Sequence, residues 1–184
     1  MSKTLILIPG FGESTHEKPY KTIKNFATKA GIKVIEINPV WDYKTMSDWY
    51  TYSKNKIKDV DIKNTVIIGF SLGAYISILL SREHSFNKSI FCSLSPFFKE
   101  QLNNIPAQAK SFLGKRRMND FTKHSLNIKS ISKKNILLFG DKDWGYAISE
   151  AKRFAVNNNY VFNEVKDVGH ELNEDYINAI IKYV

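Results

Sequence analysis

The sequence predicts an α/β fold: a six-stranded, mostly parallel sheet in the order 2-1-3-4-5-6, with helices on both faces. Short apolar segments alternate with helix-like segments six times along the 184 residues. The apolar segments are mostly continuous, and this pattern is typical of parallel strands that are buried on both faces. A G-x-S-x-G pentad, Gly69–Gly73, stands between an apolar segment and a helix-like one, where a sharp strand-to-helix turn is expected.

The expected strands are apolar runs that end at turn-forming residues. In chain order they are 3–8 before Pro9-Gly10, 32–37 before Asn38-Pro39, 65–68 before the pentad, 88–94 before Ser95-Pro96, 135–139 before Gly140, and 160–165 before Asp167-Val168-Gly169.

The expected helices show apolar residues at helical spacing, bounded by capping residues or polar turns. They cover 20–30, 45–58, 72–82, 146–157 and 172–184. The segment 95–134 is less regular, with short helices expected near 98–103, 106–113 and 117–126. We expect one domain over residues 1–184, in which 95–134 forms a small lid or insertion.

The charge of the chain is basic and unevenly distributed. The net charge is +9, and segment 95–134 carries +7 of it, with nine basic residues against two acidic ones. A basic surface of this kind attracts acidic proteins or anionic substrates, although lysine-rich helix faces are common without any partner. The segment lacks interleaved aromatic residues in a recognisable motif, so no nucleic-acid partner is expected.

Several further classes of protein are disfavoured by the sequence. No apolar run is long enough to span a membrane, and the run 5–8 is too short for a signal peptide. Cys92 is the only cysteine and lies in an apolar run, which predicts a buried, inert thiol and a cytoplasmic protein. No phosphate-binding loop, dinucleotide fingerprint or metal-ligand cluster is present, so neither a cofactor nor a metal is expected.

Ser71 is the candidate nucleophile. In an open doubly wound sheet, ligands bind at the carboxyl ends of the strands where the strand order reverses. For the expected order, this point lies between the first and third strands, whose ends carry Pro9–Gly12 and Gly69–Gly73. The amide of Leu72, at a helix N-terminus, is placed to donate to a developing oxyanion.

A serine hydroxyl needs a general base, and the base needs an acid that orients it. His170 follows the last strand at the same edge of the sheet and is the favoured base, with His16 as a distant second. Asp143 follows the fifth strand and is the favoured acid, but Asp141 is an open alternative.

These motifs resemble those of the α/β-hydrolase superfamily. The resemblance rests on the elbow at 69–73, the loop at 9–12, a G-x-x-D at 140–143 and a G-H at 169–170. The order Ser, Asp, His is also the order of that superfamily. The size is similar to that of the small, lid-poor serine hydrolases of the retinoblastoma-binding-protein type.

The resemblance implies roles for particular residues. Ser71 would be the nucleophile, Asp143 the acid and His170 the base, and the amides of Phe11 and Leu72 would form the oxyanion hole. Two departures stand out: the two leading antiparallel strands of the full fold are absent, and Pro9-Gly10 replaces the common His-Gly.

We therefore expect a serine hydrolase that cleaves a small carboxylic ester or thioester through an acyl-enzyme. The alternatives are a non-catalytic binding module on the same fold, or an esterase acting on an acidic carrier protein docked on segment 95–134. The oligomeric state is not indicated. Aromatic residues in the expected rim loops are candidates for substrate binding: Trp41, Phe70, Phe97, Phe98 and Trp144.

Overall fold

The computed structural model describes residues 3–95, 97–125, 129–143 and 148–184. Within these ranges six strands form one sheet in the order β2-β1-β3-β4-β5-β6, and every neighbouring pair is parallel. The predicted strand order is confirmed. The strands are β1 (Thr4–Ile8), β2 (Lys33–Glu36), β3 (Thr65–Phe70), β4 (Lys88–Cys92), β5 (Asn135–Gly140) and β6 (Val161–Val165).

The described helices lie close to the expected segments. They are α1 (Lys18–Lys29), α2 (Met46–Lys56), α3 (Leu72–Leu80), α4 (Ala107–Phe121), α5 (Ile148–Asn158) and α6 (Glu174–Ile181), with 3-10 turns η1 (Ile62–Asn64) and η2 (Lys99–Asn104). The expected start of the fifth helix, at residue 146, lies outside the described ranges. None of these helices is long and apolar enough to cross a membrane.

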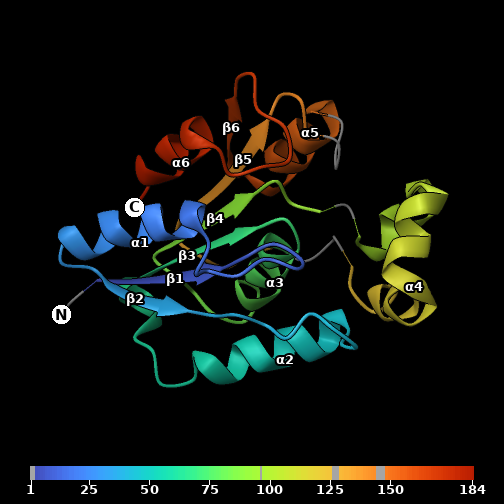
Figure 1. Cartoon of the computed structure of the whole chain (residues 1–184), viewed down its shortest axis with the longest axis horizontal. Coiled ribbons are helices and arrows are strands. Elements are labelled where there is room, and N and C mark those ends of the chain that lie inside the picture. Colours follow the sequence, from blue (N-terminus) through green and yellow to red (C-terminus); the bar gives the residue numbers. More distant parts are fainter. Residues whose placement is uncertain (1–2, 96, 126–128, 144–147) are drawn as a thin grey trace.

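The sheet separates two buried layers (Figure 1). Successive side chains of a strand point to opposite faces. In β1, Ile6 and Ile8 therefore pack in the layer formed with α2, α3 and α5, whereas Leu5 and Leu7 pack in the layer formed with α1 and α6. Because both faces are covered, the strands are apolar throughout, which explains the continuous apolar runs of the sequence.

Helix α4 lies beyond the carboxyl ends of the strands (Figure 1), and its Leu113 and Phe121 belong to the buried layer formed with α2, α3 and α5. It contacts α2 and η2. Gly114 interrupts it with φ of 79° and ψ of 157°, so that two helical pieces meet at this residue. The break explains why the sequence pattern predicts two short helices here.

We expect Gly73→Ala to destabilise the fold by about 2 kcal/mol or more, because a buried backbone contact leaves no space for a side chain. A Cβ atom at Gly73 would lie 2.3 Å from the Pro9 carbonyl oxygen and 2.4 Å from that of Ile8. Urea denaturation measures the change. Gly169→Ala is the matched control, since its Cβ would be 3.8 Å from the nearest atom. Equal stability of the two variants would contradict this account.

Candidate active site

The turn from β3 to α3 holds Ser71 in an unusual backbone conformation. Its φ is 55° and its ψ is −119°, a region that costs a non-glycine residue about 1–3 kcal/mol. Two hydrogen bonds fix it there: the Ser71 amide donates to the Cys92 carbonyl at 2.9 Å, and the Tyr75 amide donates to the Ser71 carbonyl at 3.2 Å. The turn is so tight that a Cβ at Gly69 would lie 2.2 Å from the Gly73 oxygen.

The structure brings together the three side chains favoured from the sequence. Nε2 of His170 lies 2.8 Å from Oγ of Ser71, and Nδ1 of His170 lies 2.9 Å from Oδ1 of Asp143. The Asp143 side chain is fully buried and that of His170 is 11% exposed. When Nδ1 carries its proton toward the carboxylate, Nε2 is an acceptor for the serine hydroxyl. This arrangement is able to take a proton from Ser71.

Close contacts between the loops after β5 and β6 position Asp143 and His170. A Cβ at Gly140 would lie 2.2 Å from the Val168 oxygen, and the Lys142 amide donates to the same oxygen at 3.0 Å. Asp141 accepts a hydrogen bond from the Val168 amide at 3.3 Å. Asp141 therefore links the two loops by a hydrogen bond, whereas Asp143 contacts the imidazole of His170.

All four histidines are in the described ranges, and the three other than His170 lie away from Ser71. The His16 side chain is 74% exposed and lies 3.9 Å from Glu36. His84 follows α3, at the opposite end of that helix from Ser71, and His124 lies near Ser47. Burial lowers the pKa of both His84 and His124.

The loop after β1 forms a tight turn whose hydrogen bonds leave the Phe11 amide available. The Glu13 amide donates to the Gly10 carbonyl at 3.1 Å, and Gly12 takes φ of 80°, which suits glycine in the third position of a type II turn. The Gly10 amide donates to Oε2 of Glu13 at 3.0 Å. In the described part of the chain, the amides of Phe11 and Leu72 donate to no acceptor. Both are therefore able to serve a bound anion.

Sequence reasoning missed Ser95, which follows β4. Its side chain is nearly buried, at 3% exposure, and its Oγ lies 3.1 Å from Oγ of Ser71. A signal was present, because Ser95 follows the carboxyl end of a strand next to β3. The rule that placed His170 and Asp143 at this edge applies to it equally.

Cys92, predicted to be buried, is fully buried in β4. Burial raises the pKa of its thiol, which keeps the sulfur protonated. The thiol is therefore not available as a nucleophile.

Two of the predicted substrate-binding aromatic residues are buried close to the site. The Phe70 ring centre is 5.1 Å from that of His170, and the Trp41 ring centre is 5.5 Å from that of Phe11. Both rings therefore pack against residues of the site, and their role in substrate binding stays a prediction.

The other two described candidates pack against aromatic residues of α3 and α4. Phe97 stacks on Phe121 with ring centres 5.2 Å apart, and Phe98 packs on Tyr75 at 3.9 Å. Phe97 and Phe98 are almost completely buried. Trp144 lies outside the described residues.

A cavity of about 270 Å³ opens beside His170. This volume suits a small group, since pockets for drug-sized ligands are about 300–1,000 Å³. No group of three or more potential metal ligands occurs among the described residues. The cavity is lined by Glu13, Glu17, Pro19, Tyr20, His170, Glu171, Leu172 and Asn173.

The sequence matches no protein-family model and no curated protein. The structure is similar to that of α/β-hydrolase domain-containing protein 10 from mouse, with a TM-score of 0.81 and 14% identity, over 100% of this chain and 88% of that one. It is also similar to the ydeN gene product of B. subtilis, with a TM-score of 0.74 and 16% identity, over 99% and 98% of the two chains. The chain has the α/β-hydrolase fold.

An esterase is also among the structures with this α/β-hydrolase fold. Pf2001 from Pyrococcus furiosus has a TM-score of 0.68 and 20% identity, over 99% of this chain and 82% of that one. The predicted resemblance to α/β-hydrolases is thus confirmed for the fold. The closer resemblance to the retinoblastoma-binding-protein type stays a prediction.

Proposed function

We propose that the protein is a serine hydrolase that cleaves a carboxylic ester or thioester of a small molecule. The observation that carries the proposal is the hydrogen-bonded series from Asp143 through His170 to Ser71, with distances of 2.9 and 2.8 Å. Hydrolases and esterases share the fold at low sequence identity, which is consistent with the proposal.

In the proposed reaction, Oγ of Ser71 attacks the carbonyl carbon while Nε2 of His170 accepts its proton. Asp143 holds the imidazole with Nδ1 protonated and stabilises the imidazolium that forms. The tetrahedral intermediate collapses as the imidazolium protonates the leaving alcohol or thiol. Water then attacks the acyl-enzyme with His170 again as the base, which releases the acid and restores Ser71.

Two free amides support the proposal by providing an oxyanion hole. Leu72 begins α3, so its amide carries the partial positive charge of a helix N-terminus. The Phe11 amide lies in the turn after β1, the strand that pairs with β3. Donors fixed in advance stabilise the negative charge at little cost in reorganisation.

The Ser95 hydroxyl would assist at the same oxygen atom. Ser71 has one hydroxyl proton, and in the proposed resting state it donates this proton to His170. Ser95 must then be the donor across the 3.1 Å contact between the two hydroxyls. Its proton would orient Oγ of Ser71 before the attack and stabilise the negative charge that builds on this atom as it leaves the acyl-enzyme.

Covalent labelling tests the proposed nucleophile. A fluorophosphonate probe is expected to label the wild-type protein, because this reagent phosphonylates an activated serine. Ser71→Ala is expected to lose labelling and to lose ester hydrolysis by roughly 10⁶-fold. Absence of wild-type labelling, or equal labelling of the variant, would disprove the proposal.

Two aspartates that lie two residues apart give a matched test of the acid. We expect Asp143→Asn to lower kcat by about 10⁴-fold, because the imidazole is then held in the wrong tautomer. Asp141→Asn is expected to retain most activity, since this side chain contacts the Val168 amide instead. Steady-state kinetics on a nitrophenyl ester distinguishes them, and the reverse ranking would move the role to Asp141.

Ser95→Ala is expected to lower kcat/KM by roughly 10-fold, the usual worth of one hydrogen bond to a group that becomes charged. Ser93→Ala is the control, because it also removes a buried hydroxyl, one that contacts Tyr176 at 2.9 Å. Equal kcat/KM values for the two variants would argue against a role of Ser95 at Ser71.

A further inference from the structure

Arg117 of α4 contacts the ring of Phe11, whose backbone amide is one of the two proposed oxyanion donors. Its guanidinium carbon lies 5.0 Å from the centre of the Phe11 ring and 5.6 Å from that of Trp49. A cation over an aromatic face is attracted to it, and the planar guanidinium also stacks there. Phe11 is therefore held by an element that lies about a hundred residues later in the chain.

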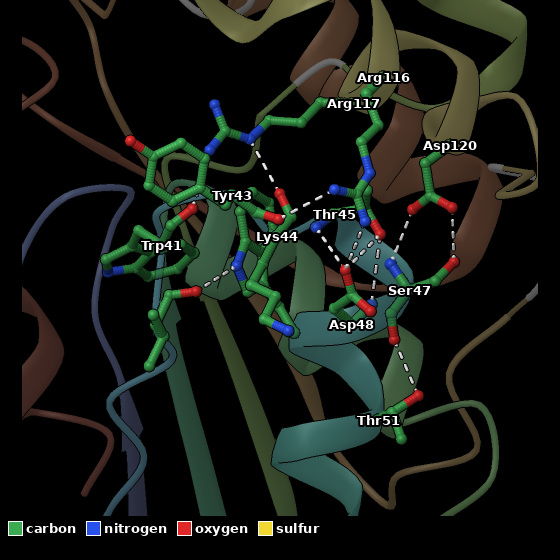
Figure 2. A network of polar contacts seen from close by, with 12 residues as sticks. Trp41, Tyr43, Lys44, Thr45, Ser47, Asp48, Thr51, Arg116, Arg117 and Asp120 are labelled. Carbon is green, nitrogen blue, oxygen red and sulfur yellow. Dashed lines mark hydrogen bonds and ion pairs between the residues drawn. The ribbon is translucent and has the colours of Figure 1, made fainter.

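Three backbone carbonyls fix the orientation of this guanidinium, and Figure 2 shows Arg117 beside two of the residues that supply them, Trp41 and Lys44. Nη2 donates to the Trp41 oxygen at 2.9 Å, Nε donates to the Lys44 oxygen at 2.9 Å, and Nη1 donates to the Leu113 oxygen at 3.4 Å. The donors of arginine form a rigid fork, so these bonds determine both the place and the plane of the group.

Trp41 connects the same arginine to the backbone of the oxyanion turn. Its indole Nε1 donates to the Glu13 carbonyl at 3.0 Å, and Glu13 closes the turn through its bond to Gly10. The turn is thus linked to Arg117 by two routes, one through the Phe11 ring and one through the main chain at Glu13.

The part of α4 that carries Arg117 is itself anchored on α2 (Figure 2). The Asp120 carboxylate accepts hydrogen bonds from the amide and hydroxyl of Ser47 at 2.8 and 2.9 Å. Arg116 donates to the Tyr43 carbonyl at 3.2 Å. Part of the charge of the basic segment is therefore engaged within the molecule.

We propose that Arg117 is a positioning residue that holds the Phe11 amide where the oxyanion develops. The proposal rests on the proposed hydrolase function. Because the oxyanion forms only in the transition state, loss of Arg117 lowers kcat and leaves KM little changed. Removal of one oxyanion donor costs about 10²–10³-fold, so a displaced donor is expected to cost roughly 10- to 100-fold.

Arg117→Gln tests the proposal, with Lys115→Gln as the control. Lys115 is an exposed basic residue two positions earlier in the same helix, so both variants remove one positive charge from α4. We expect Arg117→Gln to lower kcat on a short-chain nitrophenyl ester 10- to 100-fold and to weaken inhibition by an alkyl boronic acid, which forms a tetrahedral adduct on serine, by a similar factor. Lys115→Gln is expected to keep both values within about threefold.

A second variant covers the case in which Arg117→Gln fails to fold. Phe11→Leu keeps the amide but removes the ring that Arg117 contacts, so it is expected to lower kcat similarly. In the double variant the two losses are not expected to multiply, because both variants remove the same contact.

The outcomes separate this proposal from the proposed function. A wild-type protein that neither reacts with the fluorophosphonate nor hydrolyses esters would overturn the function itself. An active wild type with Arg117→Gln equal to Lys115→Gln would overturn only the role of Arg117. The same conclusion would follow from a change in KM alone, or from losses that multiply in the double variant.

Discussion

The candidate site depends on one backbone contact, between the start of α3 and the end of β1. At Gly73 the helix backbone passes so close to the Ile8 and Pro9 carbonyls that only a hydrogen atom fits. This approach brings the Leu72 amide beside the turn that carries Phe11. In the proposed oxyanion hole, this contact would bring together two amide donors from segments about sixty residues apart in the chain.

Around the contact at Gly73, the polar side chains of the candidate site are held by segments that are themselves fixed by hydrogen bonds and close packing. The strained backbone of Ser71 is secured by hydrogen bonds to β4 and to the next turn of α3. Asp143 and His170 sit on two loops that Gly140 allows to touch. A site built this way is organised before any ligand binds, which is the condition for effective electrostatic stabilisation of a transition state.

The sequence was informative about local structure and about which edge of the sheet carries the candidate site. Continuous apolar runs predicted parallel strands that are buried on both faces, and the carboxyl-end rule selected Ser71, His170 and Asp143 for one neighbourhood. Contacts between distant segments were not predictable in this way. The bond of Ser95 to Ser71 and the place of Arg117 over Phe11 depend on side-chain directions, which periodicity does not specify.

The separation of the site residues along the chain has a consequence for biosynthesis. Ser71 and His170 are 99 residues apart. At about 5–20 residues per second, a ribosome needs roughly 5 to 20 seconds to add the base after the proposed nucleophile. During that interval Ser71 lacks His170 as a hydrogen-bond partner, so a nascent chain would not acquire the proposed hydrolytic activity until β6 and the loop after it have joined the sheet.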